Sequence, residues 1–297
     1  MELRVLHYFL AVAREQSISA AAQSLHLTQP TLSTQLKALE EELGKQLLVR
    51  GTKGSRKVIL TEEGMILRKR AEEILTLVNK AEEEIAHSDD TVVGTVSIGA
   101  GETDIVRYFA KAARTLQKRY PDIRYQISSG NAEYVLEYLD KGLIDFGLVF
   151  GEVDQRKYQS LPLPAKDTWG VLMRRDSPLA EKEGITPQDL WDKPLLLSHQ
   201  RGGSGALFRW LKRDASQLNV VATYNLVYNA SLLVDEGLGY ALTLDKLIHT
   251  EGTDMCFRPL SPGMEATASI VWKKYQVFTK AADTFLRCLK EQLPRES

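Results

Sequence analysis

Hydrophobic residues between positions 17 and 43 follow two short helical patterns, separated by a polar break at His26-Leu27-Thr28. In the second pattern the leucines recur at intervals of four, three and four residues, which places them on one face of a helix. They are Leu32, Leu36, Leu39 and Leu43. Ser19 and Thr28 are the predicted N-caps, because a hydroxyl there can accept a bond from an unpaired N–H of the first turn.

The opposite face of this second helix carries short or amide-bearing side chains and a single cation. Its residues are Gln29, Pro30, Thr31, Ser33, Thr34, Gln35 and Lys37. Amides and hydroxyls can read base edges in the major groove, and a face with few carboxylates does not repel phosphate. An ordinary helical hairpin would show the same two helices, so this stretch alone leaves both interpretations open.

Two short β-prone runs follow, at 46–49 and 57–60, around a glycine-containing turn. This pattern predicts a hairpin with a basic tip, which includes Arg50, Lys53 and Arg56. Residues 1–60 contain eight Lys/Arg and five Asp/Glu, a net charge of +3 in a chain whose total is -1. The basic charge is therefore local, and a hairpin with this charge suits contact with the phosphate backbone of double-stranded DNA.

Residues 1–64 resemble the winged helix-turn-helix of the LysR-type transcriptional regulators. The likeness rests on M-E-L-R-V-L-H-Y-F-L-A-V-A, S-I-S-A-A-A-Q-S-L, L-T-Q-P-T-L-S-T-Q-L-K-A-L-E-E-E-L-G, L-L-V-R-G and L-T-E-E-G. One departure is Leu48, where the family usually has Phe. The resemblance implies a sequence-specific DNA-binding regulator in which a small-molecule effector controls DNA bending and promoter access.

A long amphipathic helix is predicted over residues 61–88, with apolar positions spaced four, three, four, three and four residues apart. They are Leu67, Ala71, Ile74, Val78, Ala81 and Ile85. This heptad seam either lies on its own domain or pairs with a second copy. We favour pairing, because no other element nearby in the sequence covers the seam. The resemblance agrees, since this stretch looks like the family's linker helix.

From Thr91 onward short strands alternate with helices, as in T-V-S-I-G-A, I-R-Y-Q-I-S-S and D-F-G-L-V-F. Such alternation predicts βαβ units with a mainly parallel sheet. A second unit begins at T-W-G-V-L-M-R, and T-A-S-I-V-W returns to the first sheet. The chain would cross between the two subdomains near Gln159–Leu163 and again near Phe257–Leu260.

The predicted fold is therefore α/β with an N-terminal all-α winged helix-turn-helix at 1–60 and a linker helix at 61–88. A regulatory domain follows at 91–297, with lobe I at 91–161 and 265–297 and lobe II at 162–264. This two-lobed form resembles the periplasmic solute-binding proteins, so a solute-binding module is the alternative function. The first 60 residues and the absence of an uninterrupted apolar signal-peptide core argue against a free periplasmic receptor.

Polar loops at the predicted carboxyl ends of the strands are candidate effector contacts, since ligands bind there in open α/β sheets. The candidates are Gly101, Thr103, Ser129, Asn131, His199, Gln200, Gly202, Ser204 and Asn229. Glycine and serine are also ordinary turn residues, and Asn229 fits a helix N-cap equally well. Glu102, beside the expected cleft, would either repel an anion or point outward.

Catalysis is not expected. Around Ser204 the nucleophile-elbow pattern fails, because Ala206 takes the place of its last glycine. The five histidines lack metal-ligand spacing, and the two cysteines fit a reducing cytoplasm. No cofactor, metal or membrane association is expected. The expected partners are DNA, a small-molecule effector and further copies in a homodimer or homotetramer, with RNA polymerase as another candidate.

Overall fold

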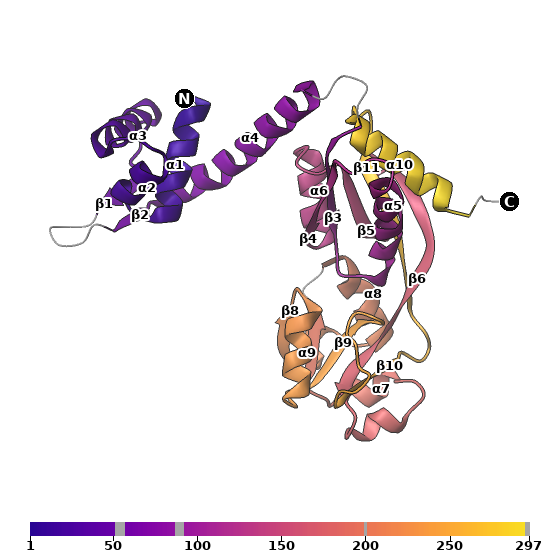
Figure 1. The fold of residues 1–297 in the computed structure, drawn as a ribbon. Coiled ribbons are helices and arrows are strands. Elements are labelled where there is room, and N and C mark those ends of the chain that lie inside the picture. The colour runs from indigo at the N-terminus through magenta and orange to yellow at the C-terminus, as the bar shows by residue number, and fades with distance from the viewer. Residues whose placement is uncertain (51–56, 87–91, 199–200, 295–297) are drawn as a thin grey trace. The chain divides into compact units, whose positions relative to one another are not determined.

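The computed structural model describes residues 1–50, 57–86, 92–198 and 201–294 (Figure 1). The chain divides into two compact units, Met1–Ala86 and His87–Ser297. Each unit has its own hydrophobic clusters, and each is considered by itself below. None of the helices within the described ranges is long and apolar enough to cross a membrane.

The first unit is helical with one small hairpin. Its elements are α1 (Leu3–Glu15), α2 (Ile18–Ser24), α3 (Gln29–Leu43), β1 (Leu48–Arg50), β2 (Val58–Leu60) and α4 (Glu62–Ala86). Strands β1 and β2 pair antiparallel, with Leu48 opposite Leu60 and Arg50 opposite Val58. The hairpin tip, with Lys53 and Arg56, lies outside the described residues.

Side-chain hydroxyls cap the N-termini of α2 and α3. The hydroxyl of Thr28 accepts the N–H of Thr31 at 3.3 Å, which confirms Thr28 as the N-cap of α3. For α2 the prediction was wrong, because Ser17 rather than Ser19 accepts the N–H of Ala20, at 3.3 Å. Helix α3 ends at Leu43, and its C-cap Gly44 has a φ of 64°, a conformation that glycine adopts at little cost.

The leucine face of α3 packs into the core of the first unit. Leu32, Leu36 and Leu39 are buried beside residues of α1 and α2, as their spacing predicts. Leu43 differs, since 41% of it is exposed at the end of the helix. Burying the three leucine side chains supplies about 1.5–3 kcal/mol each toward holding α3 in place.

Helix α4 is covered along its first half by α1. Ala71 and Leu75 are buried against Leu6 of α1, with Leu67 and Ile74 packed at the edge of this cluster. For this half the alternative holds, a helix that lies on its own domain, and the helix that covers it is distant in the sequence. The second half is different, since Leu77 is 40% exposed and Ile85 is 76% exposed.

The second unit is built on one continuous sheet in the order β4-β3-β5-β11-β6-β9-β7-β8, with β10 on β6. Its strands are β3 (Gly94–Ala100), β4 (Ile123–Ser129), β5 (Phe146–Phe150), β6 (Tyr158–Arg174), β7 (Leu195–Ser198), β8 (Val220–Tyr224), β9 (Tyr240–Leu244), β10 (Met255–Pro259) and β11 (Glu265–Lys273). Its α-helices are α5 (Arg107–Gln117), α6 (Ala132–Asp140), α7 (Pro187–Leu190), α8 (Arg201–Leu211), α9 (Val227–Asp235) and α10 (Lys280–Gln292). Short 3-10 turns at Asp104–Val106, Pro178–Glu181 and Ala215–Gln217 complete it.

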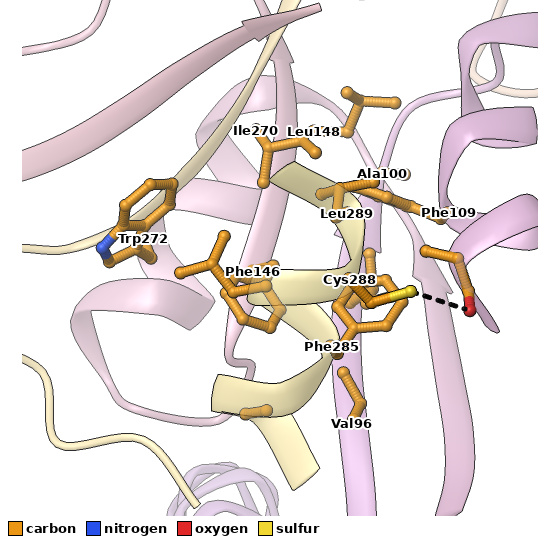
Figure 2. Packing of buried hydrophobic residues seen from close by; sticks show 14 of the residues in the cluster. Val96, Ala100, Phe109, Phe146, Leu148, Ile270, Trp272, Phe285, Cys288 and Leu289 are labelled. Atoms are coloured by element: carbon orange, nitrogen blue, oxygen red, sulfur yellow. Dashed lines mark hydrogen bonds between the residues drawn. The ribbon is translucent and has the colours of Figure 1, made fainter. Parts of the chain in front are cut away.

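Two lobes share the long strand β6. Lobe I contains β3, β4, β5 and β11, with α5 and α10 packed on one face of its sheet and α6 on the other. Figure 2 shows α10 on that core, where Phe285, Cys288 and Leu289 pack near Phe146 and Trp272. Lobe II contains β7, β8, β9 and β10, with α7 and α8 on one side and α9 on the other.

The crossing points lie later in the chain than the sequence indicated. Gln159–Leu163 does not cross, because Gln159 still pairs with Trp272 of β11 in lobe I. Strand β6 stays paired with β11 as far as Thr168 and joins β9 of lobe II at Trp169. Phe257 likewise still pairs with β6 within lobe II, and the return to lobe I begins only with β11.

Candidate DNA-binding surface and interlobe cavity

The polar face of α3 is presented away from the buried leucines. Gln29, Pro30, Thr31, Thr34 and Lys37 are exposed, and Ser33 and Gln35 are half-buried. No residue of this face is acidic. Over residues 29–37 the helix can therefore present hydroxyl and amide groups toward a polyanion. The nearest carboxylate on this side is that of Glu41, which pairs with Lys37 at 3.5 Å.

Neighbouring side chains orient two members of this face. The hydroxyl of Ser19, in α2, donates to the side-chain oxygen of Gln29 at 3.1 Å. The hydroxyls of Thr28 and Thr31 lie 2.8 Å apart. Ser19 thus positions a residue of the polar face instead of capping α2.

Glu40 ties the hairpin to α3, a role that no local sequence pattern indicates. Its Oε1 accepts the N–H groups of Leu47 at 2.7 Å and Leu48 at 3.0 Å. On the other strand, the N–H of Val58 donates to the carbonyl of Gln16 at 2.8 Å. Both strands are therefore anchored to the helical core, and Arg50 ends β1 at the base of the tip.

A cavity of about 260 Å³ lies where the lobes of the second unit meet. Lobe I contributes β5 residues such as Leu148 and Phe150, and lobe II contributes Trp169, Leu244 and Leu247. Polar atoms come from fewer positions, including Glu102, Tyr224, Asn225, Thr243 and Glu265. A mostly apolar cavity with a few polar groups is the usual form of a small-molecule site.

Glu102 reaches across this cavity. It follows β3 in lobe I, and its Oε2 accepts the N–H of Val227, the first residue of α9 in lobe II, at 2.5 Å. The side chain therefore does not point outward, and the other alternative that the sequence left, repulsion of an anion, stays a prediction. It satisfies a donor at the positive end of a helix whose N-cap, Leu226, supplies no side-chain acceptor.

Several predicted effector residues do not line the cavity, and one of them caps a helix instead. Gly101 lines the cavity, whereas Thr103, Ser129, Asn131 and Asn229 are not among its lining residues. The oxygen of Asn131 caps α6 by accepting the N–H of Tyr134 at 2.8 Å. Asn229 is an exposed residue in the first turn of α9, so it is not the N-cap either.

The remaining candidates come from one segment. Gly202 and Ser204 belong to α8, which begins at Arg201, so these two candidates lie in a helix and not in a loop. His199 and Gln200 lie outside the residues that the structure describes. Ser198, immediately before them, does line the cavity.

Thr103 instead holds a buried carboxylate at the crossing between the lobes. Its hydroxyl donates to Oδ2 of Asp167, and it also accepts the N–H of Ile105 at 3.0 Å. Asp167 is only 1% exposed. Burial raises the pKa of Asp167, and the nearby charges of Asp245 and Asp104 raise it further, while the bond from Thr103 lowers it.

Tyr224 is a neutral donor in the cavity wall. Burial raises its pKa to about 12, and the charge of Glu102 contributes in the same direction. Its hydroxyl donates to the carbonyl of Leu242 at 2.6 Å. Within the described ranges, no three His, Cys, Asp or Glu side chains come together in a group that could hold a metal ion.

Family models match both units of the chain. The model described as "Bacterial regulatory helix-turn-helix protein, lysR family" matches residues 3–65, and the "LysR substrate binding domain" matches residues 89–294. The Hca operon transcriptional activator HcaR of Escherichia coli (strain K12) is 30% identical, with 99% of this chain and 98% of that protein covered. An uncharacterized HTH-type transcriptional regulator, YfeR of Shigella flexneri, is 27% identical over 98% of this chain and 94% of that protein.

Solved structures share the fold over the full length. The crystal structure of CbnR, a LysR family transcriptional regulator, has a TM-score of 0.75 at 20% identity and covers 99% of this chain and 100% of that one. Full-length CbnR complexed with its target DNA has a TM-score of 0.74 at 21% identity, with 98% and 99% covered.

Proposed function

This chain belongs to the LysR family of DNA-binding transcriptional regulators, and from that premise we propose that α3 reads its operator and that its effector binds in the interlobe cavity. Regulation of transcription, not catalysis, is what the family models and the relatives have in common. The single observation that supports operator reading by α3 is the amphipathic character of this helix. One side is buried leucine, and the other is polar, exposed or half-buried, and free of carboxylates over residues 29–37.

We assign base reading to the polar face of α3 and phosphate contact to the hairpin. Gln35 and its neighbours would enter the major groove, while Arg50, Lys53 and Arg56 would neutralise phosphates on either side. The anchoring of both strands by Glu40 and Gln16 supports this division, since it fixes the base of the hairpin relative to α3.

The cavity suits an effector because it has walls from both lobes. A ligand that contacts both lobes binds the closed arrangement better than an open one, and this difference in affinity is what shifts the conformational balance. We propose that the shift alters DNA bending and promoter access. The shared strand β6 and the Glu102–Val227 bond are the described links through which one lobe senses the other.

The second half of α4 supports assembly of two copies. Leu77 and Ile85 are exposed there, and an apolar helix face of this kind is normally covered by a partner helix. We propose a homodimer through this half, further assembled into a homotetramer, which works in the cytoplasm with the chromosome. Contact with RNA polymerase belongs to the same proposal.

Retention of genomic DNA fragments by the full-length protein tests this function. Fragments of its own genome would be bound, washed with increasing salt and sequenced. Enrichment of a few fragments that share a two-fold symmetric site, with steeply salt-dependent retention, is expected. A free solute-binding module would show neither enrichment nor salt dependence.

A further inference from the structure

The charged residues that line the described part of the interlobe cavity are acidic. Among the lining residues that the structure describes there is no lysine, arginine or histidine, but there are two glutamates, Glu102 and Glu265. Most of the remaining wall is apolar. Against the described part of this wall, a carboxylate would meet carboxylates of its own sign.

The N-terminus of α9 is the part of this wall best suited to receive an anion. Val227, the first residue of α9, lines the cavity, and the N-cap residue Leu226 has no side-chain acceptor for the backbone N–H groups of the first turn. The chain fills this position itself, since the Glu102 carboxylate accepts the Val227 N–H at 2.5 Å. A ligand carboxylate would have to displace Glu102 or lie beside a second negative charge.

The two glutamates are not equivalent. Glu265 is more than half exposed, at 57%, and its carboxylate pairs with Lys166 at 2.6 Å. Its charge is therefore offset and screened by solvent. Glu102 is half-buried, bonds across the lobes and contributes to the raised pKa of Tyr224, so its charge acts on the cavity wall.

We propose that Glu102 sets the charge class of the effector, so that the cavity takes a small uncharged or cationic molecule with an apolar body and rejects carboxylates. This inference rests on the proposed function of the cavity as the effector site. The volume of about 260 Å³ suits one aromatic ring with a short polar substituent. For comparison, an apolar cavity of about 150 Å³ holds a benzene ring.

Three probes of nearly the same shape test the charge preference: benzamide, benzylamine and benzoate. Their dissociation constants for the full-length protein would be measured by ligand-observed NMR, with Trp169 fluorescence as a second signal from the cavity wall. Benzamide or benzylamine should bind about tenfold or more tightly than benzoate, because like charges within a few ångströms repel strongly away from bulk water.

Substitutions of Glu102 and Glu265 test which of the two glutamates causes the preference against benzoate. Glu102→Gln keeps the shape and an acceptor oxygen for the Val227 N–H but removes the charge, so benzoate should bind within about threefold of benzamide. Glu102→Ala removes the acceptor as well, and benzoate should gain at least as much. Glu265→Gln is the matched control, and it should keep the wild-type preference because Lys166 already offsets that charge.

Four results would overturn the inference: benzoate binding to the wild type as tightly as benzamide, an unchanged preference in both Glu102 variants, the same relief in Glu265→Gln, or no binding of any probe. Retention of genomic fragments is measured on the same preparations. Specific retention together with any of these results overturns the charge assignment alone, whereas loss of specific retention in the wild type overturns the proposed function.

Discussion

Replacing Thr103 by valine should destabilise the second unit, because it removes the hydroxyl that supports a buried carboxylate. Valine has nearly the same shape, so packing around the 7%-exposed side chain is retained. The loss comprises a hydrogen bond to the Asp167 carboxylate, about 1.5–3 kcal/mol, and the cap on Ile105, about 1 kcal/mol. The free energy of unfolding should therefore fall by about 2–4 kcal/mol at neutral pH.

The cost should depend on pH in a defined direction. Burial raises the pKa of Asp167 above its ordinary value of 3.8, so its contribution to stability is complete below that value and is lost as pH rises through the folded-state pKa. Removing the Thr103 hydroxyl, which lowers that pKa, moves it higher still. The variant's deficit should therefore be largest at neutral pH and smaller near pH 4, where more of the carboxyl group is protonated.

Urea unfolding followed by tryptophan fluorescence reports on the second compact unit, His87–Ser297, because all four tryptophans lie in it. At neutral pH the midpoint for Thr103→Val should fall by about 1 M, whereas Thr103→Ser, which keeps the hydroxyl, should stay close to the wild type. An unchanged midpoint, or the same deficit at both pH values, would refute this account of Thr103.

Three further predictions concern the DNA-binding unit. Gln35→Ala should cost about 1–3 kcal/mol on the operator in a fluorescence anisotropy titration and much less on random DNA, and equal losses would mean that Gln35 only contacts the backbone. Lys53→Ala should reduce the slope of log affinity against log salt by about one, and an unchanged slope would remove this lysine from the phosphate contacts. Leu77→Asp should abolish the dimer in sedimentation and DNA binding with it, while the exposed neighbour Asn79→Asp should leave both intact; a dimeric Leu77→Asp would place the interface elsewhere.

Local patterns predicted the helices of the first unit well. The spacing of Leu32, Leu36 and Leu39 and the cap at Thr28 depend on neighbours within one or two turns, and both are confirmed. Ser17 and Ser19 fit the capping rule equally from the sequence. In the structure α2 begins at Ile18, which is only 8% exposed, and Ser17 is its N-cap. The burial of Ile18 depends on tertiary packing, which the capping rule does not include.

The cavity could be predicted only in outline. Its position between two lobes follows from the alternation of strands and helices, but polar loop residues such as Thr103 and Asn131 are used by the fold itself. The wall is made largely of apolar strand ends such as Phe150 and Leu244, which look like ordinary core residues in a sequence. The sequence places Glu102 beside the cleft, but its partner Val227 lies 125 residues away, beyond any local pattern.

The central claim is that this chain recognises a particular DNA sequence. The most direct test is the ratio of its affinities for an enriched genomic fragment and for the same fragment with the shared site permuted, at one fixed salt concentration. The account predicts a ratio of about 10³ or more, with strong salt dependence on both fragments. Equal affinity for the two fragments would contradict it.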